Sequence, residues 1–250
     1  TTNSTSAQLW IDRGMAFAYG FNHEQARDAF HKAIDADPNC VMAYWGVAYA
    51  SNVDYNTQLP AKEEIYNCRD FTEKYTKLLD EGSTVTPLER RLCDAVSKRS
   101  LSKGVEYPCD EEKDTRALLR KGNEAYADAM RTLYFDCKND LSSSLAGVLM
   151  VDVSVLFVES LMNLHPWKMW PLSKGQMRPE LSTEEEEKML ISSDTLLAQR
   201  VLEEAYANNV MIGAVPHPGL AHFYVHLMEM SPTIELMKRA CEQANLLRRQ

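Results

Sequence analysis

The chain lacks the basic surplus and the long apolar runs that two large classes of protein require. Its 250 residues carry 27 Lys and Arg against 36 Asp and Glu, which gives a formal net charge of −9. Phosphate contacts need a basic surface, so this charge argues against nucleic acid and against an electrostatic membrane anchor. A bilayer-spanning helix needs about 18 apolar residues, and the longest candidate, 145–164, is interrupted by Asp152, Glu159 and Asn163. We therefore expect neither nucleic acid nor a membrane as a partner.

Cysteine is sparse and never arranged for metal binding or redox exchange. The six residues are Cys40, Cys68, Cys93, Cys109, Cys137 and Cys241. None of them forms the CxxC spacing of a zinc ribbon or a redox motif. In a long chain that is 45% hydrophobic, they indicate reduced thiols in a cytoplasmic protein, with extracellular disulfides as the alternative. The polar start, TTNSTSAQLW, has no signal-peptide core.

Several catalytic signatures are also missing. The sequence has no Gly-rich phosphate loop, no GxSxG, no HExxH and no close Cys–His pair, so no nucleotide cofactor is indicated. Alternating strand-like runs are scarce, whereas helical periodicity runs through most of the chain, with Gly and Pro mainly between the periodic segments. These features predict an all-α protein.

Residues 7–40 follow the 34-residue tetratricopeptide (TPR) pattern of two antiparallel helices. The matching positions are Trp10, Gly14, Phe17, Ala26, Phe30, Ala33 and Pro38. Only the leucine position departs from the pattern, because it is Arg13. Gly14 and Ala26 let the two helices touch, and we expect the aromatic side chains to fill the space around that contact.

The rest of the chain predicts less regular hairpins. Val41 opens a second unit, with Tyr44 and Ala48 at pattern positions, and an insertion then displaces its second helix. Further helices are expected at 61–80, 87–100, 111–136, 141–165, 183–208, 217–230 and 233–248. We expect 141–165 to pair with 194–208, and 217–230 with 233–248. The prediction is one irregular TPR-like helical-hairpin solenoid over 1–250. Its last helix has no polar capping repeat, which indicates a fragment of a longer protein or self-association at that end.

The chain resembles a family of TPR proteins found in bacteria and fungi. The resemblance rests on GFNHEQARDAFHKAIDADPNCVMAYWGVAYA, ESLMNLHPWKMW and HPGLAHFYVHLMEMSP, which together cover roughly a third of the chain. Members of that family are mostly known as repeat proteins without a settled activity. Similar proteins usually continue past this C-terminus with further histidine-containing repeats. The resemblance therefore implies a fold more than a function.

The segment HPGLAHFYVHLME, 217–229, predicts a helix with a histidine stripe. The spacing HxxxHxxE places His222, His226 and Glu229 on one narrow face, since residues three and four apart are neighbours on a helix. Two imidazoles and a carboxylate form a ligand set for zinc, iron or copper. His217 lies apart, near the N-cap. The alternative is the solvated polar face of an amphipathic helix.

A second polar line crosses a helix that is otherwise apolar. Asp152, Glu159 and Asn163 stack along 145–164, and buried carboxylates are costly unless they are paired or bind a metal. One hypothesis is that this line faces the histidine stripe, with Glu159 or Asp152 as a further ligand or general base. The alternative is a water-filled groove, or Arg and Lys side chains of a neighbouring helix.

Two hypotheses of function follow. The first is a scaffold that holds a peptide, a protein segment or a small ligand in a concave groove, because the first helix of each hairpin lines that surface. His217, Tyr224, Trp167 and Trp170 are its candidate ligand-binding residues, with loop packing as the alternative for both tryptophans. The second is a metal-dependent enzyme or metal-binding protein that uses the histidine stripe. His23 is expected to be only a cap neighbour.

Overall fold

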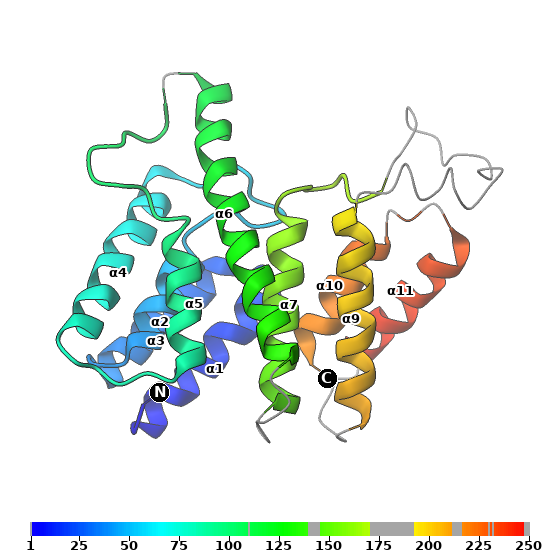
Figure 1. The fold of residues 1–250 in the computed structure, drawn as a ribbon, viewed down its shortest axis with the longest axis horizontal. Coiled ribbons are helices and arrows are strands. Elements are labelled where there is room, and N and C mark those ends of the chain that lie inside the picture. Colours follow the sequence, from blue (N-terminus) through cyan, green and yellow to red (C-terminus); the bar gives the residue numbers. More distant parts are fainter. Residues whose placement is uncertain are drawn as a thin grey trace. The chain divides into compact units, whose positions relative to one another are not determined.

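A computed structural model describes residues 2–109, 111–139, 146–170, 193–211, 217–229, 231 and 233–247. Within those ranges every regular element is a helix, which confirms the all-α class (Figure 1). The helices are α1 (Thr5–Tyr19), α2 (His23–Ala36), α3 (Val41–Tyr49), α4 (Lys62–Asp80), α5 (Pro87–Ser97), α6 (Glu112–Asn139), α7 (Ala146–Met162), α9 (Ser193–Met211), α10 (Pro218–Met228) and α11 (Ile234–Leu247). The expected helical residues 141–145 and 183–192 lie outside the described ranges.

The chain divides into two compact units, Thr1–Leu133 and Tyr134–Gln250, and the boundary falls inside α6. In the first unit α1 packs on α2 and α3 on α4; in the second, α7 packs on α9 and α10 on α11. These are the neighbours that the hairpin pattern predicts. A continuous TPR-like solenoid over 1–250 stays a prediction.

Phe30 of α2 is a fully buried contact point of the first unit. It is fully buried, and a Cβ placed on Gly14 would lie 2.6 Å from its ring. A Cβ on Gly46 of α3 would lie closer still. Glycine at both positions thus lets α1 and α3 approach the same ring. The other predicted fillers are less buried than expected, because Phe17 is 39% exposed and Trp10 lies under the side chains of Arg13 and Lys32 at the surface.

Local sequence signals fix several helix starts. The Asn22 side chain caps α2 by accepting a hydrogen bond from the Gln25 N–H. Thr86 and Glu89 form a capping box at α5, with Pro87 in its first turn. Such caps satisfy the N–H groups that a helix leaves without partners.

The insertion after α3 is buried. Residues 51–55 are all 5% exposed or less, and buried backbone groups need hydrogen-bond partners. Asp54 Oδ1 accepts from the N–H groups of Asn56 and Thr57, at 2.7 and 2.8 Å. The buried Arg99 donates to Val53 O and to Asn123 Oδ1. This loop is therefore part of the core of the first unit.

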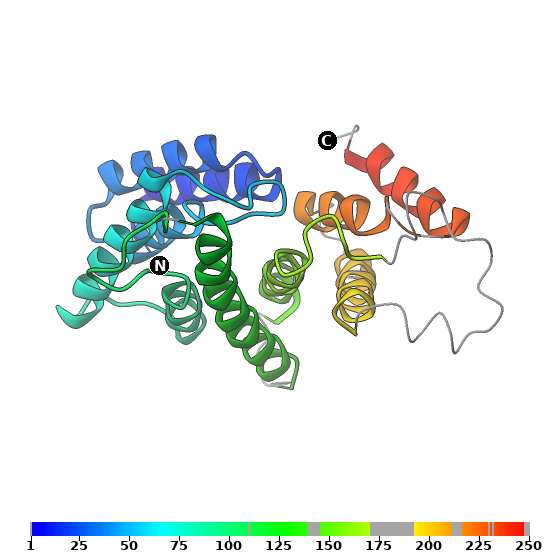
Figure 2. The same ribbon diagram turned by 90° about the horizontal axis from the view of Figure 1, so that it is seen from above.

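In the second unit the apolar helix α7 packs against two other described helices. It contacts α9 and α10, and α10 also contacts α9 and α11. Figures 1 and 2 show α10 (orange) beside α9 (yellow) and α11 (red). From Val151 to the end of α7 almost every side chain is buried, as the apolar sequence of the helix predicts. Among the residues described, no helix combines the length and apolarity that crossing a bilayer requires.

All six cysteines carry free thiols. Cys40, Cys68 and Cys93 are buried, and burial raises the pKa of each of these thiols. That environment keeps them protonated and unreactive.

Candidate functional site

His217 is the N-cap of α10. Its Nδ1 accepts hydrogen bonds from the N–H groups of Gly219, at 3.1 Å, and Leu220, at 3.4 Å. An accepting Nδ1 carries no proton, so in the neutral ring the proton is on Nε2. That nitrogen lies 3.1 Å from Asp152 Oδ1 of α7, to which it donates. His217 thus joins the acid line of α7 to the start of α10, and it does so through Asp152.

The histidine stripe is assembled as a chain of contacts. His226 Nδ1 lies 2.8 Å from Glu229 Oε1, and His226 Nε2 lies 3.0 Å from His222 Nε2. A carboxylate only accepts, so His226 Nδ1 donates to Glu229. In a neutral ring His226 Nε2 then accepts the proton of His222 Nε2. The stripe is therefore a hydrogen-bonded chain of three side chains. Its two imidazoles are half-buried.

Glu229 does not take the ligand position that the spacing predicts. It binds the ring nitrogen of His226 that points away from His222, so the three groups do not converge on one point. Among the described residues no group of three or more His, Cys, Asp and Glu is arranged to hold a metal ion. The two Nε2 atoms do converge, however. In a tetrahedral zinc site they would be about 3.3 Å apart, close to the separation present.

The two tryptophans after α7 differ in role. Trp170 is 4% exposed and its indole N–H donates to Leu227 O of α10, so its ring packs the loop onto the helix. This is the packing alternative, and it conflicts with a ligand-stacking role for Trp170. Trp167 is 44% exposed and lies edge-on to His226, with ring centroids 6.1 Å apart. It leaves an aromatic surface beside the histidine stripe.

The two carboxylates of α7 are in different environments. Glu159 is 1% exposed and its Oε1 accepts from Asn163 Nδ2 at 2.6 Å, whereas the Asp152 side chain is 40% exposed and contacts His217. Hydrogen bonding to Asn163 within the same helix stabilises the buried carboxylate. The sequence placed Asn163 on the same polar line as Glu159, and this hydrogen bond joins the two residues.

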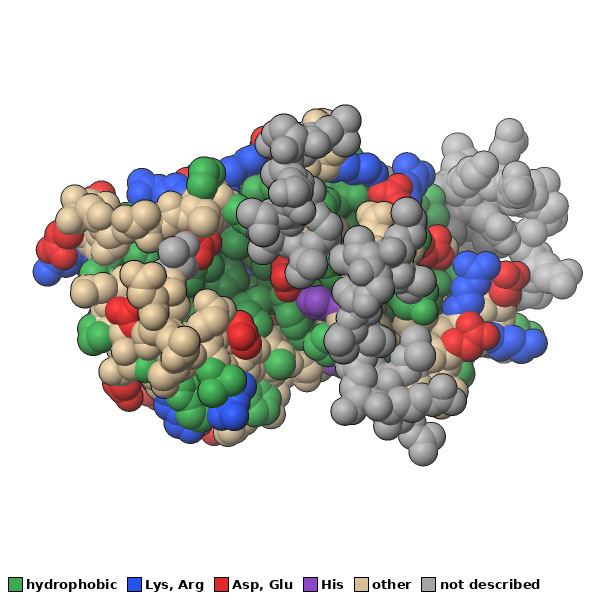
Figure 3. Space-filling view, turned by 90° about the horizontal axis from the view of Figure 1, so that it is seen from below, with side chains coloured by type: hydrophobic (Ala, Val, Ile, Leu, Met, Phe, Trp, Pro, Cys, Tyr) green, Lys and Arg blue, Asp and Glu red, His purple; other side chains and the backbone are tan. Residues whose placement is uncertain are grey.

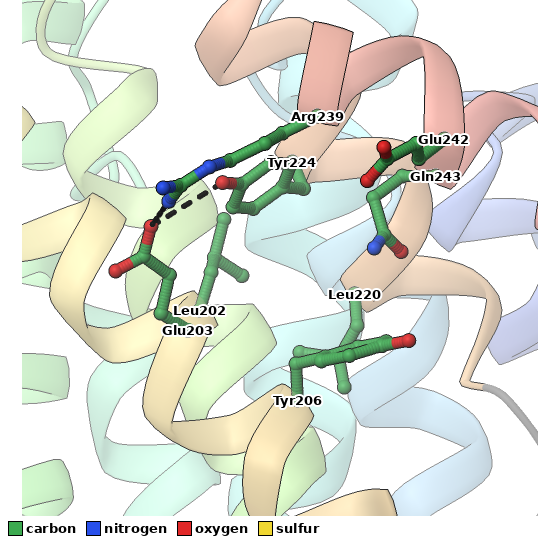
Figure 4. Close-up of a pocket in the computed structure, with 8 residues that line it drawn as sticks. All are labelled: Leu202, Glu203, Tyr206, Leu220, Tyr224, Arg239, Glu242 and Gln243. Carbon is green, nitrogen blue, oxygen red and sulfur yellow. Dashed lines mark hydrogen bonds and ion pairs between the residues drawn. The ribbon is translucent and has the colours of Figure 1, made fainter. Parts of the chain in front are cut away.

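A hollow of about 250 Å³ lies among α9, α10 and α11. Figure 4 shows its lining, which is Leu202, Glu203, Tyr206, Leu220, Tyr224, Arg239, Glu242 and Gln243. The two leucines and the Tyr206 ring supply apolar surface, and the α11 side chains supply a polar edge. Of the predicted ligand-binding residues, Tyr224 alone lines this hollow.

A polar network holds one side of the hollow in place. Glu203 Oε1 lies 3.3 Å from the Tyr224 hydroxyl, which donates to it, and 3.4 Å from Arg239 Nη1. Arg239 also donates to Glu235 Oε1 at 2.8 Å. Burial, together with the nearby Glu203, raises the pKa of Tyr224, so its hydroxyl stays a donor. The three helices are thus tied by side chains that also face the cavity.

No motif or spacing in the sequence indicated Glu203, Tyr206 and Arg239. Each is an ordinary residue of a surface helix, and they meet only through the packing of α9 against α10 and α11. Side chains of both charges are scattered over the face shown in Figure 3, so charge does not single out the hollow either.

No protein family, no curated protein and no solved structure matches this chain.

Proposed function

We propose that this protein is a helical-hairpin binding scaffold of the TPR type, and that the hollow among α9, α10 and α11 holds a segment of a peptide. The observation that carries the proposal is the hollow itself, with apolar surface from Leu202, Leu220 and Tyr206 beside the polar edge of α11. Ligand sites are usually concave and mainly apolar, with a few polar groups that fix orientation.

The lining defines the ligand. Tyr206 is 39% exposed, so its ring is available to an apolar or aromatic side chain. Arg239, Glu242 and Gln243 offer donors and acceptors to the backbone beside that side chain. A short peptide with one apolar anchor fits this combination better than a charged small molecule, because the edge carries both signs of charge.

The test is a selection from a random heptapeptide display library on the full chain. We expect selected peptides whose affinity falls at least about tenfold in Arg239→Ala and in Tyr206→Ala, the size of effect typical of anchor residues. Ile234→Ala is the matched control, since Ile234 is 65% exposed on α11 and is not part of the lining. Peptides that bind all three variants as well as the parent would place the site elsewhere.

A second candidate function has one observation in its favour, the convergence of His222 Nε2 and His226 Nε2 at 3.0 Å. We propose that these two atoms hold a transition metal ion, zinc, iron or copper. Glu229 would then orient His226 from behind, as carboxylates do for metal-bound imidazoles. The remaining ligands would be solvent or a substrate, and His222 would give up its Nε2 proton.

Metal analysis of protein purified without an affinity tag tests this candidate. We expect close to one equivalent in the parent, loss in His222→Ala and His226→Ala, and weakened retention in Glu229→Gln. His165→Ala is the matched control, because His165 lies on the loop after α7 and contacts Asp194 instead. Less than about a tenth of an equivalent in the parent under zinc, iron and copper supply would contradict the metal site.

A further inference from the structure

The first unit contains a polar hollow of about 280 Å³ that the proposed function does not use. It lies where the start of α2 meets the buried loop after α3 and the start of α4. Its walls include His23, Arg27, Asp54 and Glu64. The volume is several times the 30 Å³ share of a liquid water molecule, so a small polar ligand fits.

His23 is a buried residue of the hollow's lining, and one of its ring nitrogens has no hydrogen bond among the described residues. The side chain belongs to a residue only 7% exposed, and its Nδ1 makes no hydrogen bond among the described residues. The nearest opposite group, Asp54 Oδ2, is 3.6 Å away, which is too long for a hydrogen bond. Buried polar atoms normally have partners, so this atom points to a ligand.

The hollow presents acceptors to such a ligand. Burial outweighs the attraction of Asp54 and lowers the pKa of His23 to about 4, so the ring is neutral at pH 7. Asp54 Oδ1 is taken by the loop amides of Asn56 and Thr57, and Oδ2 faces His23. At a neutral ring beside a carboxylate, a ligand N–H group finds two hydrogen-bond acceptors, whereas an anion is repelled by the carboxylate.

The charge count favours one positive charge. Arg27 is held by Glu64, at 2.8 Å, and by Ala50 O, at 2.7 Å. Counting the lining acids Glu24, Asp54 and Glu64 against Arg27 and the nearby Arg99 leaves a net formal side-chain charge of −1. Glu24 and Glu64 also sit in the first turns of α2 and α4, where carboxylates offset the positive helix ends.

One wall of the hollow is aromatic. Phe21 lines the hollow and stacks on Tyr55, with ring centroids 6.2 Å apart. Cations bind favourably over such rings. Phe21 has a positive φ of 54°, a backbone conformation uncommon for a bulky residue.

We propose that this hollow binds a monocation of the alkylammonium or guanidinium class. Its N–H groups donate hydrogen bonds to Asp54 Oδ2 and His23 Nδ1. The end of a Lys or Arg side chain and a free amine share this chemistry. The site lies in the first unit and is independent of the hollow among α9, α10 and α11.

The test follows backbone amide signals of the ¹⁵N-labelled full chain by NMR. The probes are n-butylammonium and methylguanidinium, with 1-butanol and butyrate at the same ionic strength as controls. We expect saturable shifts at residues 22–27 and 52–57 with the cations only. No saturation up to about 50 mM of either cation would overturn the proposal, as would equal shifts with 1-butanol.

Substitutions in the lining test whether the cation binds in this hollow. Asp54→Asn keeps the oxygen that accepts from Asn56 and Thr57, and we expect it to weaken cation binding at least about tenfold. Glu24→Gln, at an exposed position of the lining, should weaken binding about two- to threefold and decides the matter if Asp54→Asn does not fold. Asp35→Asn, exposed on the same helix and outside the lining, should change nothing. Unchanged affinity in both lining variants would overturn the proposal.

The source of the cation is distinguished by two further probes. Tighter binding of N-acetyl-lysinamide than of butylammonium would identify a peptide side chain as the ligand. Tighter binding of spermidine would identify a free amine. Either result supports the site, and failure of both together with butylammonium and methylguanidinium overturns it.

Discussion

At the residue scale, Phe30 sets how closely three helices pack. Its ring lies against Gly14 of α1 and Gly46 of α3, and neither position has room for a Cβ. Because Phe30 is fully buried, its ring cannot move aside without displacing other core atoms. Glycine at positions 14 and 46 is therefore a steric requirement of one aromatic side chain.

We predict that Gly46→Ala lowers the free energy of unfolding by about 1–3 kcal/mol, the usual effect of overpacking. Denaturant unfolding of the full chain measures it. Gly20→Ala is the matched control, since a Cβ there would meet its nearest atom, Phe17 O, at an ordinary 3.4 Å. Equal stability of the two variants would contradict the packing described around Phe30.

His23 makes stability depend on pH in a defined window. Its folded pKa is about 4 and its ordinary value is 6.5, so between these values the unfolded chain binds a proton that the folded chain does not. The free energy of unfolding therefore falls as pH falls from 6.5 to 4, by up to about 3 kcal/mol from this group. In His23→Gln the slope over that window should flatten, and an unchanged slope would show that His23 is accessible to protons in the folded state.

At the element scale, α10 begins on a histidine where Ser, Thr, Asp or Asn is usual. His217 can act as the N-cap because its two ring nitrogens have different partners. Nδ1 caps α10, and Nε2 contacts Asp152 of α7. The cap thus fixes the start of α10 against α7, and with it the position of the histidine stripe.

We predict that His217→Ala lowers the free energy of unfolding by about 1–2 kcal/mol, the cost of a lost cap and a weakened contact with Asp152. His217→Asn restores the cap alone, so it should recover about half of that loss. Thermal unfolding at one pH compares the three proteins. Recovery of nothing by His217→Asn would mean that the contact with Asp152, and not the cap, fixes α10.

The elements also show how far sequence reasoning reaches. Periodicity and end signals predicted the helices from α1 to α11 within a few residues at most described ends, because each signal is local. The buried loop at 51–55 was expected only as an insertion, since burial of a polar loop depends on distant partners such as Arg99. His23 was predicted as a cap neighbour for the same reason, because Asp54 reaches it only in the folded chain.

At the scale of the whole molecule, two compact units each carry a hollow lined from several helices. The predicted stripe of His222, His226 and Glu229 does form, yet Glu229 contacts the far nitrogen of His226. Helical spacing places side chains on one face but does not fix their rotamers. The hollow among α9, α10 and α11 depends on the packing of three helices, which no local pattern encodes.

The central claim is that the hollow among α9, α10 and α11 is the peptide site, and methyl NMR tests it most directly. A peptide selected on the full chain is titrated into protein with labelled leucine methyl groups. The account predicts saturable shifts at Leu202 and Leu220, which line the hollow, and none at the exposed Leu9 of α1. Saturable shifts confined to methyl groups outside the hollow, with Leu202 and Leu220 unchanged, would contradict it.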